Sequence, residues 1–408
     1  MSIEATLTYS FLFISLYFEV FLLLAFIERT KRGSHIRSIK LPEVMPTVAV
    51  VVPCFNEEKG VVATVESLLA LDYPADKIEF ILVDDGSTDN TLATIQRFAT
   101  EPRVKVFHKE NGGKHTAMNL ALANTTAELI GCLDADSIVA RDALLRIVPI
   151  FSNQRIAAVT PGIHVRDPKT WLQHLQNVEY RLSLFNRYIL AALGSVFITP
   201  GPFSFFRASV VRELGAWRYA HSTEDMEMAL RFQEAGHLIA NAPKAIVHTS
   251  TPSTLPRLYR QRVRWTYGWL RNAVDYRHML GNWRYGNLGL LILPSAIITI
   301  FTGIYFFFRI AFYGFQGLYH KYIEVQFAGS AAPSFELFYV NTSAMYFLIF
   351  ASVALILVLI SLGSLIGTGK RMPPYTTPLF LIFYSFLVPL WLTAAVVRAT
   401  LKTGVQWR

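Results

Sequence analysis

The chain has 408 residues, of which 52% are hydrophobic and only 16% are charged. Soluble domains carry about a quarter charged residues, so this composition excludes a purely soluble protein and also a disordered one. The formal net charge is +9. On a soluble protein that charge would suggest nucleic-acid binding, but on a membrane protein it indicates basic residues at the cytoplasmic lipid surface. The two cysteines, Cys54 and Cys132, lie in apolar runs and predict neither a disulfide framework nor a zinc site.

The hydrophobic residues are concentrated in four stretches, each long enough to cross about 30 Å of hydrocarbon. These predicted spans cover residues 7–27, 288–313, 337–366 and 377–397. The sequence therefore predicts a first transmembrane helix within 1–28 and a cytosolic domain at 45–255. An interfacial segment at 256–287 and three transmembrane helices within 288–408 follow.

Basic residues after the first span give the expected orientation. A signal peptide is the alternative for this span, but no basic segment precedes it and no small-residue cleavage site follows it. The basic residues place this end in the cytosol and the N-terminus outside. They are Arg29, Lys31, Arg32, Arg37 and Lys40. Alternation then puts Lys370 and Arg371 inside, and it leaves Arg398, Lys402 and Arg408 outside, where they fit the rule less well.

The predicted cytosolic domain alternates strand and helix patterns. The β-branched run at 48–52 is typical of a buried parallel strand, and further strands are expected at 80–83, 104–107 and 129–133. Helical spacing of apolar residues predicts helices at 61–69, 89–98 and 116–123. Such alternation predicts an α/β domain with a doubly wound sheet, whose ligands bind at the carboxyl ends of the strands.

Two adjacent carboxylates, Asp84 and Asp85, follow the second strand. A turn at Gly86 and a helix cap within Ser87–Asp89 account for part of this motif. They leave unexplained why two like charges stand side by side at a strand end. A carboxylate in this position can accept the imide N–H of a uracil base, so both residues are candidates for substrate binding.

Asp134 and Asp136 follow the fourth strand, two residues apart. Residues at this spacing face the same side and can share one cation, and Mg²⁺ binds through one or two carboxylates together with phosphate oxygens. A capped loop is the alternative. Between the two acidic pairs, Gly112 and Gly113 permit close approach of a phosphate, and Lys114 supplies a positive charge. The spacing is not that of a Walker loop.

Thr223, Glu224 and Asp225 precede another predicted helix. Thr223 capping that helix is one interpretation. The other is that Asp225 lies at the mouth of a cleft and accepts a proton from an acceptor hydroxyl. The segment 200–203 (Pro-Gly-Pro-Phe) is consistent either with an acceptor groove or with a simple turn.

The most specific pattern is Gln261-x-x-Arg264-Trp265, within a basic and aromatic stretch at 256–285. An amphipathic helix lying on the bilayer explains part of this stretch. The spacing also lets Gln261 and Arg264 face one site, with Arg264 near a leaving diphosphate and Trp265 against a sugar ring. The aromatic segment 171–193 is either a second interfacial helix or a helix of the domain.

In this order and between apolar spans, the four motifs resemble those of the processive, membrane-embedded family 2 glycosyltransferases. That family includes the cellulose, chitin, hyaluronan and poly-N-acetylglucosamine synthases. The resemblance implies a GT-A-type nucleotide-sugar-binding domain inserted between transmembrane helices, with interfacial amphipathic helices. It also implies roles for the motif residues. Asp84 would contact uracil, Asp134 would contact the donor nucleotide, and Asp136 would coordinate Mg²⁺ or Mn²⁺. Asp225 would be the general base with Glu224 beside it, and the diphosphate and the acceptor end would be held by Gln261, Arg264 and Trp265.

The implied reaction is one inverting displacement that forms a β-linkage from a UDP-sugar, with UDP-N-acetylglucosamine as the leading donor. The expected product is an exopolysaccharide whose synthesis is coupled to export across a bacterial-type plasma (inner) membrane. The alternatives are a glucose or hyaluronan-type polymer, or transfer of one or a few sugars to a lipid or short acceptor. A transporter is disfavoured, because ionisable residues gather outside the spans. Four spans are few for a pore, so a small membrane subunit or a homo-oligomer is a further expectation.

Overall fold

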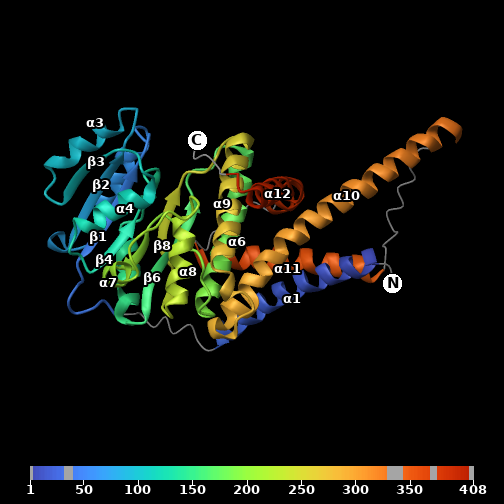
Figure 1. Cartoon of the computed structure of the whole chain (residues 1–408), viewed down its shortest axis with the longest axis horizontal. Helices are drawn as coiled ribbons and strands as arrows, with labels where there is room; N and C mark the ends of the chain where they lie inside the picture. Colours follow the sequence, from blue (N-terminus) through green and yellow to red (C-terminus); the bar gives the residue numbers. More distant parts are fainter. Residues whose placement is uncertain (1–2, 32–39, 329–342, 368–374, 404–408) are drawn as a thin grey trace.

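The computed structural model describes residues 3–31, 40–328, 343–367 and 375–403. An α/β domain lies on one side and long apolar helices extend from the other, with two further helices between them (Figure 1). Several residues used above to predict the orientation lie outside the described residues. These are Arg32, Arg37, Lys370, Arg371 and Arg408.

The first half of the domain forms a parallel sheet. Strand β1 (Val48–Cys54) pairs in parallel with β2 (Ile78–Asp85) and with β4 (Leu129–Cys132), and β2 pairs in parallel with β3 (Val104–Lys109). Helices cover both faces of this part of the sheet, which is why β1 is an almost uninterrupted run of buried apolar residues. These four strands lie where the sequence predicts them.

The second half of the sheet is mixed. It contains β5 (Ser137–Val139), β6 (Ile156–Val165), β7 (Ser204–Arg207) and β8 (Leu238–Thr249). Strand β7 runs antiparallel to both β4 and β6, and β5 runs antiparallel to β8. The full order is β3-β2-β1-β4-β7-β6-β8-β5. The expectation of a doubly wound sheet therefore describes the first four strands but not the rest.

Each face of the sheet has its own apolar core. Val50, Phe80 and Leu68 belong to one core, and Val51 and Met118 belong to the other, as expected for alternating residues on a strand. The helices of the domain are α2 (Val61–Leu69), α3 (Thr91–Gln96), α4 (Lys114–Ala123), α5 (Ala143–Ile147), α7 (Ala208–Glu213) and α8 (Glu224–Glu234).

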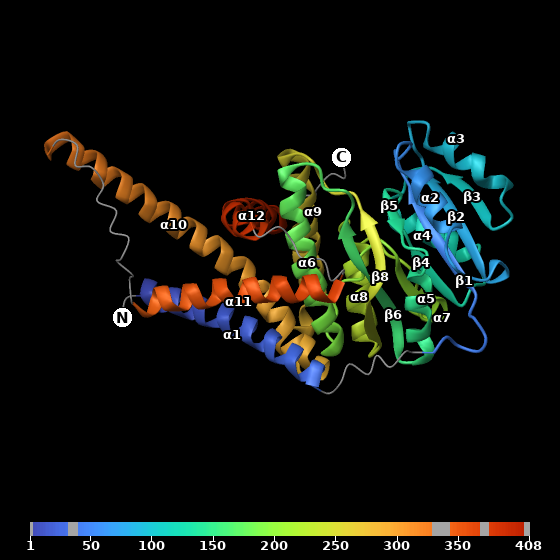
Figure 2. The ribbon, with the colours of Figure 1, turned by 180° about the vertical axis from the view of Figure 1, so that it is seen from behind.

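Within the described ranges, four helices are long and apolar enough to cross a membrane. They are α1 (Ile3–Lys31), α10 (Leu293–Ala328), α11 (Ala344–Gly367) and α12 (Thr376–Leu401). Helix α12 is seen end-on in both Figure 1 and Figure 2, whereas α1 and α11 run across the picture. The axis of α12 is therefore steeply inclined to α1 and α11, and the four apolar helices do not form a parallel bundle.

Two helices join the domain to the apolar helices. Helix α6 (Trp171–Ala192) begins with a capping box between Thr170 and Gln173, and α9 (Leu255–Asp275) carries the Gln-x-x-Arg-Trp motif. Both lie between the sheet and the apolar helices (Figure 2). Val178 of α6 and Val263 of α9 share one apolar cluster with residues of α10, α11 and α12. The helices of this junction thus come from the segment predicted as interfacial, 256–287, and from the segment 171–193, for which an interfacial helix and a domain helix were both considered.

The packing of β4 against β7 gives a test of the fold. A Cβ added at Gly131 of β4 would lie 2.5 Å from Phe205 Cε1, and Phe205 is fully buried. We expect Gly131→Ala to destabilise the protein by about 1–3 kcal/mol through overpacking, seen as a lower apparent melting temperature. The matched control is Gly314→Ala in α10, where a Cβ meets no atom within 4 Å. Equal melting temperatures for the two variants would contradict this packing.

Candidate active site

Asp84 presents a buried acceptor near the carboxyl end of β2. Its side chain is buried, and Oδ2 lies 2.7 Å from His108 Nδ1 and accepts a hydrogen bond from Ser87 N at 3.3 Å. Its other oxygen, Oδ1, is also buried and accepts no hydrogen bond from the described residues. Burying such an acceptor without a partner is costly, so this oxygen is suited to an N–H donor from a ligand.

Asp85 has a different environment from Asp84. Its carboxylate accepts hydrogen bonds from Lys109 Nζ at 2.6 Å, Gly112 N at 3.1 Å and Gly113 N at 2.8 Å. Gly113 has a φ of +87°, a conformation that glycine adopts readily. Because both oxygens of Asp85 bind the chain itself, Asp85 orders the glycine loop and positions Lys114 at the start of α4.

An ion pair joins this loop to the end of β4. Lys114 Nζ lies 2.5 Å from Asp134 Oδ1. Burial alone would lower the pKa of Lys114, but Asp134 and Glu224 outweigh it and hold that pKa well above its usual value. Gly201 lies against this pair, since a Cβ added there would be 2.8 Å from Asp134 Oδ1. The lysine therefore stays charged, and no larger residue fits at position 201 without displacing the pair.

Asp136 lies in a field of excess negative charge. Burial raises its pKa to about 7, and the neighbouring carboxylates of Asp134 and Glu57 add to the shift. No group of three metal-ligating side chains occurs among the described residues. Mg²⁺ uses one or two protein carboxylates and completes its shell with phosphate oxygens and water. The chemistry of this donor set therefore fits such an ion held with a phosphate ligand.

Asp225 lies in the first turn of α8. Its backbone oxygen accepts hydrogen bonds from Thr199 N at 3.1 Å and Thr199 Oγ1 at 2.7 Å, and its Oδ1 accepts one from Met226 N at 2.9 Å. The pKa of Asp225 is raised to about 6. Burial is the main cause and the Glu224 carboxylate adds to the shift, whereas Lys114 and Arg264 oppose it. A carboxyl group tuned toward neutral pH in this way is suited to proton transfer.

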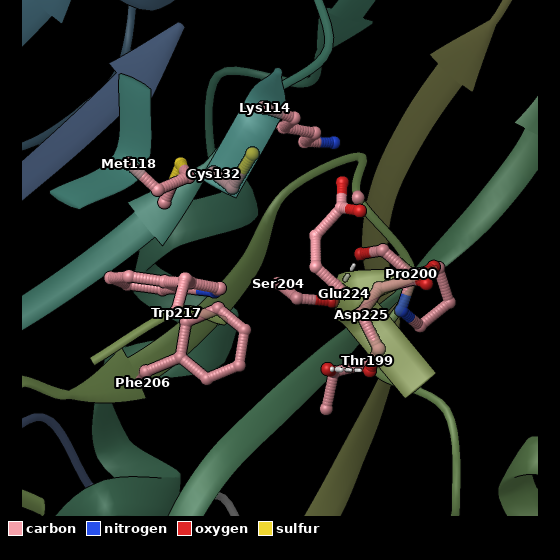
Figure 3. Close-up of a pocket in the computed structure, with 11 residues that line it drawn as sticks. Lys114, Met118, Cys132, Thr199, Pro200, Ser204, Phe206, Trp217, Glu224 and Asp225 are labelled. Carbon is pink, nitrogen blue, oxygen red and sulfur yellow. Dashed lines mark hydrogen bonds between the residues drawn. The ribbon is translucent and has the colours of Figure 1, made fainter. Parts of the chain in front are cut away.

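Lys114, Glu224 and Asp225 meet in one pocket (Figure 3), whereas Asp84, Asp85, Asp134 and Asp136 are not among the residues that line it. The Lys114 side chain and the Glu224 carboxylate extend toward each other across it. The pocket is lined by Lys114, Met118, Cys132, Thr199, Pro200, Gly201, Ser204, Phe206, Trp217, Glu224 and Asp225. Elements distant in sequence thus bring together the glycine loop and the Thr-Glu-Asp motif.

Helix α9 contributes unequally to this site. Burial lowers the pKa of Arg264, while Glu224, Asp225 and Asp134 raise it, so its guanidinium lies in the field of the pocket carboxylates. Gln261 Oε1 instead accepts a hydrogen bond from Arg262 Nη1 at 3.2 Å, and Trp265 stays 37% exposed. None of Gln261, Arg264 and Trp265 is among the described residues that line the pocket.

Thr223 ties α9 to the start of α8. The capping bond considered for Thr223 is not formed, because Thr223 Oγ1 donates to Ala220 O at 3.1 Å. Thr223 Oγ1 also accepts a hydrogen bond from Asn272 Nδ2 of α9 at 2.9 Å. A Cβ at Gly268 would collide with the Thr223 side chain, so α9 packs directly on the motif that carries Asp225.

Several residues of the site, Thr199 and Glu57 among them, were not singled out by sequence reasoning. Thr199 anchors the backbone of Asp225 and carries no sequence signal of its own. Gly201 lies in the segment 200–203, for which a groove or a turn was predicted, and the structure places it in the pocket lining. Glu57 follows the end of β1, and its position on the same sheet edge as Asp136 was the available signal.

Comparison with known proteins agrees with this architecture. Residues 46–268 match the family model described as "Glycosyltransferase like family 2". A poly-beta-1,6-N-acetyl-D-glucosamine synthase from Staphylococcus epidermidis is 28% identical over 299 residues, which cover 72% of this chain and 71% of that protein. A protein of the same name from Staphylococcus aureus (strain COL) is 32% identical over 219 residues, or 53% of this chain and 52% of the relative. This second match thus spans about half the length of each protein.

A solved structure shares the fold. A mannosyltransferase from Pyrobaculum calidifontis, in complex with GDP-Man and Mn²⁺, has a TM-score of 0.59 at 19% identity. The match covers 96% of this chain and 99% of that chain. At this identity the match shows a common fold and no more. The family model covers more than half of the 408 residues, so the chain belongs to the family 2-like glycosyltransferases, with a GT-A-like domain.

Proposed function

We propose that this chain transfers N-acetylglucosamine from UDP-N-acetylglucosamine to the end of a growing β-linked polysaccharide. The observation that carries the proposal is the pocket lined by Lys114, Glu224 and Asp225, in which the pKa of Asp225 is raised to about 6 and Arg264 acts on that carboxylate electrostatically. The identity of the sugar is supported by the names of the staphylococcal relatives. The inverting and processive character follows from the resemblance of the motifs.

In this proposal Asp225 is the general base. It accepts the proton of the acceptor hydroxyl as that oxygen attacks the anomeric carbon, and one displacement inverts the α-linked donor to a β-linked product. Lys114 and Arg264 stabilise the negative charge that develops on the departing UDP. The buried Oδ1 of Asp84 accepts the uracil N–H. Asp85 acts through the glycine loop, while Asp134 and Glu224 keep Lys114 charged and in place.

Asp136 is the residue that would hold a divalent cation, Mg²⁺ or Mn²⁺. The cation would neutralise part of the diphosphate charge of the donor. Burial raises the pKa of Asp136 to about 7, and the neighbouring carboxylates of Asp134 and Glu57, which contribute to that shift, provide the negative charge that supports this assignment. Gln261 and Trp265, beside Arg264 on α9, are proposed to hold the acceptor end, with the Trp265 indole against a sugar ring.

The proposed location is a bacterial-type plasma membrane, with the catalytic domain in the cytosol and the N-terminus outside. The four apolar helices support membrane insertion, and Arg29 and Lys31 at the end of α1 support the orientation. The growing polysaccharide would leave beside these helices. Coupling of synthesis to export, and a small membrane subunit or a second copy of the chain, belong to the same proposal.

The function is tested with purified protein in lipid, a panel of UDP-sugars, and Mg²⁺ or Mn²⁺. We expect UDP release with UDP-N-acetylglucosamine and products many sugars long, measured by mass spectrometry. Products of only one or two added sugars would exclude polymerisation. Absence of UDP release from every sugar would exclude the enzyme activity under test.

The role of Asp225 is tested by Asp225→Asn, which keeps the shape of the side chain but removes the base. We expect UDP release to fall by about 10²–10⁴-fold while UDP binding, measured by calorimetry, is retained. At saturating metal, kcat/KM of the unmodified enzyme should fall about tenfold per pH unit below about pH 6, because protonated Asp225 accepts no proton. A variant with near-normal turnover would show that another group is the base.

The metal assignment is tested by Asp136→Asn. Loss of a ligating carboxylate should raise the Mg²⁺ concentration needed for half-maximal UDP release by about tenfold or more. The control is Asp142→Asn, which removes an exposed carboxylate paired with Arg146. An unchanged metal requirement in Asp136→Asn would rule out Asp136 as the ligand.

A further inference from the structure

Arg262, inside the Gln-Arg-Val-Arg-Trp segment, is a buried cation. Only 4% of the residue is exposed, and its Nη2 lies 2.7 Å from Glu179 Oε2 of α6. The Glu179 carboxylate keeps the buried guanidinium charged, and it raises the pKa of Arg262 although burial opposes this. Sequence reasoning assigned no role to Arg262 or Glu179.

A third element reaches the same carboxylate. Tyr384 of α12 donates a hydrogen bond to Glu179 Oε2 at 3.0 Å, and the Tyr384 residue is itself buried. Helix α12 is seen end-on where α6 and α9 run lengthwise, so it crosses both at a steep angle (Figure 1). Glu179 therefore lies where the two junction helices meet an apolar helix.

Arg262 also contacts two motif residues. Its Nη1 donates to Gln261 Oε1 at 3.2 Å, and its guanidinium carbon lies 4.3 Å from the centre of the Trp265 ring. A planar guanidinium over an indole restricts the ring by stacking, which a lysine ammonium does not reproduce. One guanidinium thus fixes both the Gln261 amide and the Trp265 indole.

We propose that Glu179, Arg262 and Tyr384 are positioning residues, which hold Gln261 and Trp265 in the orientation that binds the acceptor end and thereby tie the acceptor site to α12. This inference rests on the proposed function, in which Trp265 stacks on the acceptor sugar. It predicts that loosening the contact in α12 weakens acceptor binding without weakening donor binding.

A second arrangement in the chain provides a matched control. Arg231, Glu227 and Tyr276 form the same kind of triad, with Arg231 Nη2 and Tyr276 OH each 2.7 Å from a Glu227 oxygen. Arg231 is also buried, but its Nη1 donates a hydrogen bond to Leu214 O at 2.6 Å. Tyr276→Phe therefore removes an equivalent Tyr–Glu hydrogen bond that does not lead to Gln261 or Trp265.

The kinetic test uses the full chain in lipid nanodiscs, UDP-N-acetylglucosamine, and short β-linked N-acetylglucosamine oligosaccharides as acceptors. We expect Tyr384→Phe and Arg262→Lys each to raise the acceptor KM by about tenfold with the donor KM unchanged. In a Trp265→Ala background, Tyr384→Phe should raise the acceptor KM by clearly less, because the part of its effect that acts through Trp265 is already lost. Tyr276→Phe should leave the acceptor KM unchanged.

A spectroscopic test is independent of activity. In protein labelled with fluorotryptophan, the Trp265 resonance is assigned from its loss in Trp265→Phe. We expect Tyr384→Phe and Arg262→Lys to shift or broaden this resonance, and Tyr276→Phe to leave it unchanged. The resonance of Trp217, which packs against Phe206 in the domain, should not move in any of these variants.

Several results would overturn the inference. An unmoved Trp265 resonance in Tyr384→Phe and Arg262→Lys would show that the triad does not position the indole. Donor and acceptor KM rising together, or additive effects of Tyr384→Phe and Trp265→Ala, would show a merely structural role. An unmodified enzyme that releases no UDP would refute the proposed function instead, and the Trp265 resonance would then decide the positioning alone.

Discussion

The structure depends on carboxylates gathered at one edge of the sheet and on the few cations that hold them there. Besides burial, the Asp134 carboxylate raises the pKa of both Asp136 and Asp225, and at Asp225 the cations Lys114 and Arg264 oppose that shift. Like charges buried together oppose folding unless each has a compensating partner. The Lys114–Asp134 ion pair, whose side chains are 17% and 36% exposed, supplies one such partner at the site. The Asp85–Gly113 contact, the absence of a side chain at Gly201 and the start of α4 all keep that lysine in place.

Helix α9 connects this charge cluster to the rest of the molecule. One face packs on the motif of Asp225, through the close contact of Gly268 with Thr223 and the hydrogen bond from Asn272. Elsewhere on α9, Arg264 lies in the field of the pocket carboxylates, and Arg262 forms an ion pair with Glu179 of α6. Since a helix moves as a rigid unit, a displacement of α9 against α12 would reach the pocket through all of these contacts together.

The sequence predicts the local elements well and the assembly less well. The buried valine run of β1 and the acidic residues ending β2 and β4 are local patterns, so their strands and their common edge follow from the order of residues. The antiparallel insertion of β7 between β4 and β6 depends on pairing between distant segments, which no local pattern encodes. For the same reason Asp84 and Asp85 look equivalent in the sequence. Only the tertiary structure shows that a buried oxygen of Asp84 accepts no hydrogen bond from the described residues, while both oxygens of Asp85 accept hydrogen bonds from the glycine loop and one of them also from Lys109.

The basic and aromatic stretch at 256–285 left two interpretations open, a helix on the lipid surface or a group facing the diphosphate. Both interpretations can hold, because the helical period places the arginines of this stretch on different sides of α9. Arg257 and Arg260 are exposed, Arg262 is buried against Glu179, and Arg264 lies in the field of the pocket carboxylates. Arginines two residues apart on a helix point in different directions, so one segment can serve the surface, the junction and the site. The net charge of +9 is therefore in part a set of arginines with separate electrostatic partners rather than a uniform basic surface.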